Sequence, residues 1–266
     1  MNFQETIAAA ISDVEEHGYD SQARIDGWLE RIEQAARLAM LPEAQVQELL
    51  NRTIRGIYTK MITRKGALSL HKGISSFTLD QVKPKLHAEL ERRIMASANL
   101  IKLNREQMLA KTKQRFTGWA TSIPAGGSDA VDKRQVKEDL KKALKQLPYE
   151  ERRVLIDQGH KFTSALNSII ATDGGAIAAT WHSHFRQPGY DYREDHKERD
   201  GHVYLIRDCW AQQQGLVKVG KDGYTDQITE PGEEVFCRCA YSYIYAIRSL
   251  PEVMLTAKGR EALKVR

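Results

Sequence analysis

The sequence has no long apolar run, no basic leader and few cysteines. A run of roughly 18 apolar residues, which a membrane-spanning helix needs, occurs nowhere in the 266 residues, so we predict no membrane partner. The acidic residues 1–20 place no basic region ahead of an apolar stretch, so we expect no secretory signal. The 3 cysteines are an odd number, and the pair in Cys237-Arg238-Cys239 is too close in sequence to form an unstrained disulfide. We therefore expect a reduced, cytoplasmic setting.

Signatures of several enzyme classes are also missing. The chain has no Gly-rich phosphate-binding loop of the Walker type. No Ser or Cys nucleophile with a positioned base can be picked out. Aromatic residues do not interleave with the basic ones, as they do where nucleic-acid bases stack on protein side chains. The sequence therefore completes none of these catalytic, nucleotide-binding or base-stacking patterns.

Charge is distributed unevenly along the chain. Residues 1–50 carry 3 Arg against 10 Asp and Glu, whereas residues 51–146 carry 21 Lys and Arg against 8 Asp and Glu. A basic segment of this kind attracts phosphate backbones or an acidic protein surface. The alternative interpretation is a solvated helix face rich in lysine. The candidate nucleic-acid contacts are Lys102, Arg105, Lys111, Lys113, Arg115, Lys133, Arg134, Lys137, Lys141 and Lys142.

Apolar residues recur at helical spacing through the first two thirds of the chain. The stripe Val82–Ile94 advances in four-residue steps and predicts a long helix from about Leu79 to near Trp119. Two later stripes predict two more helices, the second of them starting at Pro148. Asp173-Gly174-Gly175 predicts the end of the last helix, because glycine accepts the left-handed conformation of a helix C-terminus.

After Gly175 the pattern changes to short apolar segments typical of strands. The predicted elements are the strands Ala176–Trp181, Val203–Ile206, Leu216–Val219 and Val235–Tyr245, a hairpin turn at Lys221-Asp222-Gly223, and a closing helix from Pro251 to Lys264. Because side chains alternate across a strand, Cys237 and Cys239 would face the same side.

The predicted fold class is α+β, with a long, mostly helical N-terminal part followed by a small mixed α/β C-terminal domain. Residues 1–125 form the helical N-terminal region that includes the long helix. Residues 126–175 form a helical connector, and residues 176–266 form the C-terminal domain with short strands.

Cysteine and histidine near one another are the ligands that zinc prefers. The candidate ligands are His196, His202, Cys209, Cys237 and Cys239. A structural zinc ion is therefore the candidate cofactor. The alternative is no cofactor, with two buried cysteines acting as small apolar residues and His196 hydrogen-bonded into the turn at Asp200-Gly201.

Two further hypotheses concern the residues around the histidines. Asp195, His196, Asp200 and His202 lie close together in sequence, with His182 and His184 upstream, as the ligands of a metal-dependent nuclease would. Arg238 would face away from the two cysteines, and it would either pair with Asp200 or Glu233 or remain exposed.

These residues resemble the phage head-morphogenesis, or minor head protein, family, of which the phage Mu F protein is the namesake. The residues that carry the resemblance are Arg193, His196, Asp200, Gly201, Cys237, Arg238 and Cys239, with the turn Glu230-Pro231-Gly232-Glu233 ahead of the cysteines. The similar region runs from about Val154 to Tyr241, roughly a third of the chain.

The resemblance implies a non-enzymatic minor capsid protein of a tailed phage. Such a protein is found in the virion head near the portal vertex, and in the host cytoplasm during assembly. The implied partners are the portal protein, the major capsid protein, or both, and packaged double-stranded DNA bound without sequence recognition. The apolar stripe Val82–Ile94 would dock on the portal or inner capsid, in head morphogenesis and in DNA packaging or ejection. The alternatives are a metal-dependent nucleic-acid-processing enzyme and a DNA-binding protein.

Overall fold

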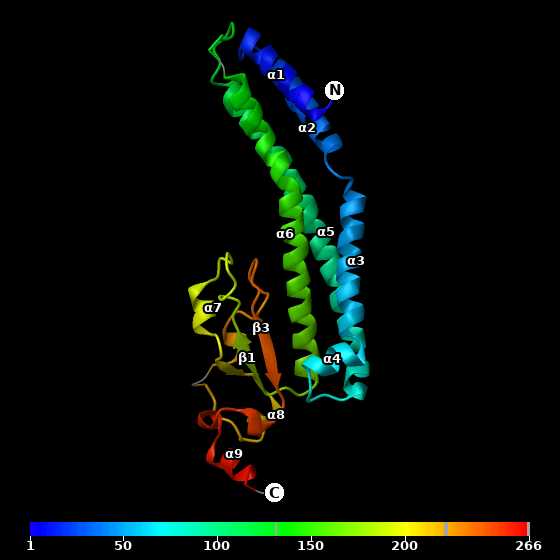
Figure 1. The fold of residues 1–266 in the computed structure, drawn as a ribbon, viewed down its shortest axis with the longest axis vertical. Coiled ribbons are helices and arrows are strands. Elements are labelled where there is room, and N and C mark those ends of the chain that lie inside the picture. The colour runs from blue at the N-terminus through cyan, green and yellow to red at the C-terminus, as the bar shows by residue number, and fades with distance from the viewer. Residues whose placement is uncertain (131, 221–222, 265–266) are drawn as a thin grey trace. The chain divides into compact units, whose positions relative to one another are not determined.

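The computed structural model describes residues 1–130, 132–220 and 223–264 (Figure 1). Helices fill the N-terminal part of the chain, and a three-stranded antiparallel sheet lies in the C-terminal part. The predicted α+β class is therefore confirmed. None of the helices in the described part of the chain combines the length and the apolar character that crossing a membrane requires.

Three of the first four helices start where a side chain caps them. The four are α1 (Phe3–His17), α2 (Gln22–Ala39), α3 (Glu43–Met61) and α4 (Arg64–Leu70). Asn2 and Glu5 form a reciprocal capping box at the start of α1. The hydroxyls of Ser21 and Thr63 accept backbone N–H bonds at the starts of α2 and α4.

Two long helices follow. The predicted long helix is confirmed as α5 (Ser76–Ala120). The prediction of two separate helices after residue 130 is wrong, because α6 (Lys133–Asp173) is continuous and Pro148 lies inside it. A proline inside a helix removes one backbone hydrogen bond and clashes with the preceding turn. The helix continues nonetheless, since it buries apolar side chains on both sides of Pro148, and tertiary packing supplies most of a helix's stability.

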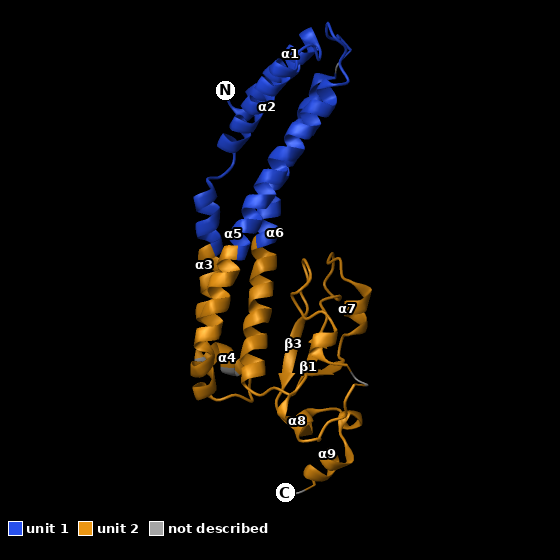
Figure 2. Ribbon diagram, turned by 180° about the vertical axis from the view of Figure 1, so that it is seen from behind, with its two compact units in different colours: residues 1–50, 96–154 blue, residues 51–95, 155–266 orange. Residues whose placement is uncertain are grey.

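The chain divides into two compact units (Figure 2). Unit 1 comprises residues 1–50 and 96–154, and unit 2 comprises residues 51–95 and 155–266. The core of unit 1 joins side chains of α1 and α2 to parts of α5 and α6, with Phe116 fully buried among them. The predicted boundaries at 125 and 175 differ from these units. The unit boundaries after residues 95 and 154 fall inside the long helices α5 and α6.

The sheet belongs to unit 2. It consists of β1 (Ala178–His182), β2 (Val203–Leu205) and β3 (Ala240–Ile244) in the order β2-β1-β3, so that β1 is central. Ala179 pairs with Tyr204 on one side and with Tyr243 on the other. The remaining elements are α7 (Glu194–Glu198), α8 (Trp210–Gln213), α9 (Ala257–Ala262) and the 3-10 turns Thr225–Gln227, Ile247–Ser249 and Glu252–Met254.

Several C-terminal predictions need correction. The predicted strand Val235–Tyr245 is shorter, since ladder pairing begins at Ala240. Leu216–Val219 is not a strand, and Val217 makes only an isolated bridge with Leu255. The predicted helix from Pro251 to Lys264 is a 3-10 turn followed by the short α9. In the predicted hairpin turn, Lys221 and Asp222 lie outside the described residues.

The apolar stripe Val82–Ile94 has a different role from the one expected. Val82, Leu86 and Leu90 are each at most 2% exposed, so the stripe forms part of the chain's own core. The predicted docking of this stripe on another protein is therefore wrong. A four-residue repeat marks the buried face of a helix, and the sequence does not say whether the same chain or a partner buries it.

A buried histidine links three parts of unit 2. His71 follows α4 and is fully buried. Its Nδ1 lies 2.7 Å from the hydroxyl of Tyr245, and its Nε2 lies 2.9 Å from Oδ1 of Asn167. The amide oxygen only accepts hydrogen bonds, so Nε2 carries the proton and Nδ1 accepts from the tyrosine hydroxyl. Burial lowers the pKa of His71, although the hydrogen bond to Asn167 partly opposes this effect.

We predict that mild acid destabilises unit 2 through His71. The unfolded chain binds a proton near the ordinary histidine pKa of 6.5, whereas the folded chain binds it only at lower pH. The contribution of neutral His71 to the free energy of unfolding is therefore complete above pH 6.5, the pKa of the unfolded chain, and falls as the pH drops below it. Urea unfolding at several pH values between 7.5 and 5 would measure the slope. In His71→Gln, which stays uncharged, the slope is expected to be smaller; an unchanged slope would assign the acid sensitivity to other groups.

Candidate metal centre

The sheet topology brings two distant segments together. β2 and β3 both run antiparallel to β1, so each begins beside the end of β1. The segment that leaves β1 contains α7, and the segment that enters β3 contains Cys237 and Cys239. These segments therefore meet at one edge of the sheet.

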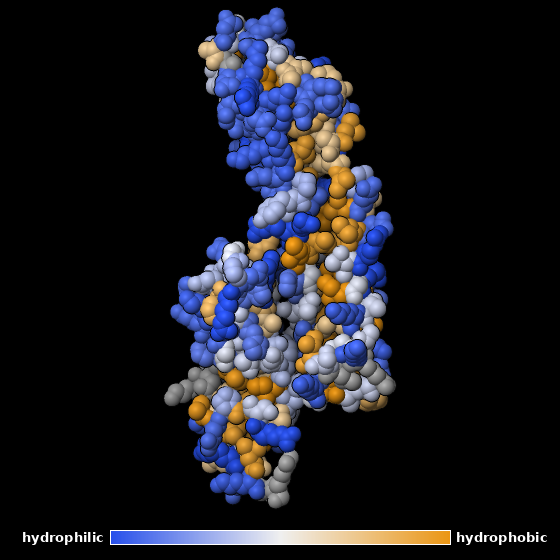
Figure 3. Space-filling view, in the orientation of Figure 1, coloured by the Kyte–Doolittle hydropathy of each residue, from blue (hydrophilic) through white to orange (hydrophobic). Residues whose placement is uncertain are grey.

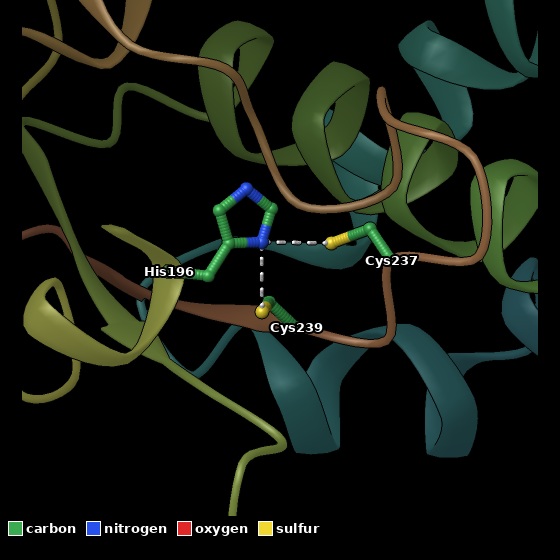
Figure 4. Close-up of side chains that lie close together, drawn as sticks. All are labelled: His196, Cys237 and Cys239. Atoms are coloured by element: carbon green, nitrogen blue, oxygen red, sulfur yellow. Dashed lines mark hydrogen bonds between the residues drawn. The ribbon is translucent and has the colours of Figure 1, made fainter. Parts of the chain in front are cut away.

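His196 of α7 lies against both cysteines at this edge (Figure 4). Its Nδ1 is 3.6 Å from Sγ of Cys237 and 3.6 Å from Sγ of Cys239. All three side chains are buried, with His196 at 2% exposure. The surface around α7 is mainly hydrophilic on the face that Figure 3 shows. The prediction that both cysteines face one side is confirmed, although their backbone precedes the strand.

The other nitrogen of the imidazole faces a carboxylate. Nε2 of His196 lies 3.4 Å from Oε1 of Glu234, and Oε2 of Glu234 lies 2.5 Å from Nε of Arg193. Arg193 also donates to the backbone carbonyl of Val235. A carboxylate at Nε2 favours the proton on that nitrogen, which leaves the lone pair of Nδ1 directed at the sulfurs.

Hydrogen bonds make the two thiols inequivalent. The thiol of Cys239 donates to the sulfur of Cys237, and the backbone N–H groups of Gly232 and Cys239 donate to the same sulfur. These bonds lower the pKa of Cys237 below that of an ordinary thiol, although burial opposes them. The pKa of Cys239 is raised because its proton is held by Cys237 and because it is buried. Cys237 is therefore the group that ionises first.

The backbone turn at residues 232–236 positions Cys237 and Cys239. Phe236 has a φ of 61°, which a bulky side chain rarely adopts, and its N–H donates to Oδ1 of Asp157 at 2.6 Å. Gly232 has a φ of 88°, and an added Cβ there would approach Ser164 to 3.1 Å. The turn before the cysteines therefore fits closely against α6.

Aromatic side chains enclose the histidine. The ring of Trp181 is fully buried and meets the His196 ring edge-on at a centroid distance of 5.1 Å. Tyr241 packs on the same indole at 5.4 Å, and the guanidinium of Arg199 lies 5.0 Å from its centroid. Arg199 also pairs with Asp195. This arrangement fixes the position of α7 against the sheet.

A small cavity adjoins the cysteines. Its volume is about 140 Å³, and Cys239, Tyr241 and His160 contribute to its wall. The hydroxyl oxygen of Tyr241 is buried and has no hydrogen-bond partner among the described residues. Buried polar atoms are rarely left without a partner, so water in this cavity would satisfy the hydroxyl.

The Asp200-Gly201 turn does not bind His196, contrary to the alternative prediction. Oδ1 of Asp200 accepts from the backbone N–H of Ser183 at 2.8 Å, and its other oxygen pairs with Arg186. The N–H of Gly201, which has a φ of 79°, donates to the carbonyl of Trp181. The turn therefore secures the end of β1.

Arg238 also differs from prediction. Its guanidinium lies over the ring of Tyr190 at 5.5 Å, and Nη1 lies 3.5 Å from Oε1 of Gln187. Within the described part of the chain it forms no ion pair with Asp200 or Glu233. Its side chain also lines the cavity to which Cys239 contributes, so the predicted direction away from the cysteines is not tested by these contacts.

Two of the five candidate zinc ligands lie elsewhere. Cys209 is buried in a separate apolar cluster with Leu205 and Ala211. His202 is exposed and lines a surface hollow with Val203. The structure brings together His196, Cys237 and Cys239, whose ligand atoms lie within 4.8 Å of one another.

The residues of the nuclease hypothesis are dispersed. Nε2 of His182 lies 2.8 Å from the hydroxyl of Ser242, and His184 is hydrogen-bonded to Gln187. Asp195 and Glu234 both approach Nε2 of His196, but each carboxylate already pairs with an arginine. Asp195, His196 and Glu234 form a second group whose ligand atoms lie within 4.8 Å of one another, so the nuclease alternative stays a prediction.

The basic candidates all lie in unit 1, and acidic partners balance several of them. Lys113 pairs with Glu33, and Lys133 pairs with Glu15. Arg105 and Lys141 are buried, which makes them poor candidates for nucleic-acid contact. Lys102, Lys111, Arg134 and Lys142 are exposed, whereas Arg115 and Lys137 are half-buried. Unit 1 as a whole has 16 Lys and Arg against 17 Asp and Glu, so the acidic N-terminal segment cancels the positive charge.

Sequence reasoning missed Glu234, Asp157 and Tyr190, which support the centre without contributing to its ligand set. Of the three, only Glu234 could have been predicted from the sequence. It lies shortly before the cysteines, and a histidine ligand commonly has a carboxylate partner. No family model, curated protein or solved structure matches this chain. The resemblance to phage minor head proteins therefore stays a prediction that rests on the residues themselves.

Proposed function

We propose that this chain is a minor head protein of a tailed phage that acts in head morphogenesis at the portal vertex or inner capsid. In this role it is not an enzyme. Unit 2 would contribute a compact C-terminal module built around His196 and the Cys237-Arg238-Cys239 segment, and the helices would provide the surface for the portal or major capsid protein. Its place would be the virion head, after assembly in the host cytoplasm.

One observation carries the proposal. The residues that resemble the family fall in two segments of the sequence, and the fold packs the two segments together, with Nδ1 of His196 3.6 Å from both sulfurs. Arg193, from the first segment, donates to the carbonyl of Val235, at the start of the second. Three of the seven residues that carry the resemblance, His196, Cys237 and Cys239, thus meet in one buried cluster.

An assembly role fits these contacts better than hydrolysis does. Asp200 accepts a hydrogen bond from the backbone of Ser183, and Arg193 donates one to the backbone of Val235. Arg199 lies over the ring of Trp181 and pairs with Asp195. A hydrolytic centre also needs a general base or another reacting group that substrate can reach. Here the polar groups around His196 are committed to one another.

Contact with DNA would come from the first part of the predicted basic segment 51–146 and not from the ten named residues, which lie in unit 1. The surplus of positive charge lies in residues 51–95 of unit 2, with 10 Lys and Arg against 3 Asp and Glu. Contacts of this kind neutralise phosphates without reading the base sequence. We propose packaged DNA as a secondary partner of this segment.

The direct test is made in the phage that encodes the chain. We expect the tagged chain to co-purify with the portal protein from infected cells, and removal of the gene to reduce the yield of infectious particles until wild type is supplied. Normal heads with normal infectivity in its absence would refute the proposal.

A nuclease assay distinguishes the assembly role from the alternative of a metal-dependent nuclease. Wild type and His196→Ala would be incubated with DNA in the presence of Mg²⁺, Mn²⁺ or Zn²⁺. We expect no cleavage by either protein. Cleavage by wild type that is lost in His196→Ala would replace the assembly role with the enzymatic one.

A further inference from the structure

The spacing of the three ligand atoms matches a tetrahedral metal site. In such a site, with Zn–S bonds of about 2.3 Å and Zn–N bonds of about 2.0–2.1 Å, a nitrogen and a sulfur ligand lie roughly 3.5–3.6 Å apart. The two Nδ1–Sγ distances here are both 3.6 Å. We propose that His196, Cys237 and Cys239 bind one zinc ion, through Nδ1 and the two sulfurs, and that water is the fourth ligand.

Hydrogen bonding alone explains the arrangement less well. A neutral imidazole nitrogen has one lone pair in the ring plane, which accepts one well-aligned hydrogen bond. Both sulfurs approach this nitrogen at the same distance, as Figure 4 shows. An ion between the three atoms accounts for equal approach by both sulfurs.

The surroundings of His196 prepare it for this role. Glu234 faces Nε2, and Arg193 holds Glu234 in turn, so Nδ1 is the nitrogen that presents its lone pair. A carboxylate on the outer nitrogen of a histidine ligand orients the ring and strengthens its bond to the metal. Trp181, packed edge-on against the ring, restricts its rotation further.

The balance of charge allows the ion to be buried. Two thiolates neutralise the two charges of Zn²⁺, so no unpaired charge is left in the interior. Soft sulfur ligands combined with imidazole in tetrahedral geometry select zinc over magnesium or calcium, which prefer oxygen.

Water is the fourth ligand that the surroundings favour. Within the described residues the ligand group holds these three side chains. Cys239 forms part of the wall of the cavity of about 140 Å³, which has room for water. Tyr241, whose hydroxyl has no hydrogen-bond partner among the described residues, lines the same cavity. The centre would thus have three protein ligands and one exchangeable water ligand.

The test uses the full chain and does not depend on its role in a phage. The protein would be stripped of metal with a chelator under reducing conditions and titrated with zinc against a chromophoric competitor. We expect one zinc ion per wild-type chain. X-ray absorption is expected to show two sulfur and two nitrogen or oxygen neighbours.

Variants then assign the ligands. Cys239→Ala and His196→Ala are expected to lose the zinc, whereas Cys209→Ala removes a buried thiol outside the centre and is expected to keep it. Glu234→Gln, a positioning variant, is expected to weaken zinc binding by about 10–100-fold and to keep the same sulfur and nitrogen neighbours. Because a ligand variant can unfold, circular dichroism would accompany each titration.

Three results would overturn the proposal. The first is a wild-type chain that binds no zinc at competitor strengths in the micromolar range. The second is a loss of zinc in Cys209→Ala equal to that in Cys239→Ala. The third is an absorption spectrum that shows three or more sulfur neighbours, or none.

Discussion

Replacing Trp181 with alanine is expected to lower the free energy of unfolding of unit 2 by about 3–5 kcal/mol. Trp181 is among the largest fully buried side chains, and its ring contacts those of His196 and Tyr241. Truncation would remove buried apolar surface and leave a cavity between β1 and α7. The guanidinium of Arg199 would also lose the ring over which it lies.

Urea unfolding followed by circular dichroism would measure this loss, with the transition of unit 2 analysed separately if the units unfold in two steps. Trp210→Ala is the matched control, since Trp210 also lies in unit 2 but is 36% exposed. We expect a markedly smaller effect there. Equal shifts for the two variants would contradict the central packing role given to Trp181.

The buried ion pair of unit 1 provides the second large effect. Arg105 and Glu151 are 8% and 9% exposed, and their Nε and Oε1 atoms lie 2.7 Å apart. Removing either partner leaves the other charge buried without compensation. Arg105→Met or Glu151→Leu alone is therefore expected to destabilise unit 1 by about 3–5 kcal/mol.

The double replacement Arg105→Met/Glu151→Leu should recover most of the loss. Apolar side chains of similar volume need no desolvation, and replacing a whole buried pair is often neutral. A complete double-mutant cycle by urea unfolding would measure the coupling. Lys145→Ala, which removes an ammonium paired with Glu138 in solvent, serves as the control and should leave the midpoint nearly unchanged. Additive losses from the two single changes would show that the pair does not act as a unit.

The helices were largely predictable, and the exceptions have a physical cause. The stripe beginning at Val82 predicts α5 because a helix that buries one face must repeat its apolar residues at that spacing. Pro148 misled the prediction, because local preference favours a helix start at proline and the packing of α6 on both sides overrides it. The sequence shows the local secondary-structure preference of a segment. It does not show how much apolar surface that segment buries in the fold.

The candidate centre was predictable only in part. Cys237 and Cys239 are one residue apart, so their common direction followed from the backbone. The choice of His196 over His202 and Cys209 depends on the pairing of β1 with β2 and β3, which joins segments far apart in the chain. The same limit applies to charge: separate counts along the sequence did not show that Glu33 meets Lys113 and Glu15 meets Lys133.

The antiparallel pairing of β3 with β1 has one more consequence. His196 is positioned by the segment that leaves β1, and the cysteines are positioned by the start of β3 and by the turn before it, which packs on α6. The chain from residue 206 to residue 220 contributes none of these contacts and does not set the ligand distances. Insertions or deletions there would change the surface of the protein and leave the distances between His196, Cys237 and Cys239 unchanged. Distant homologues would accordingly share two short conserved blocks separated by a gap of variable length.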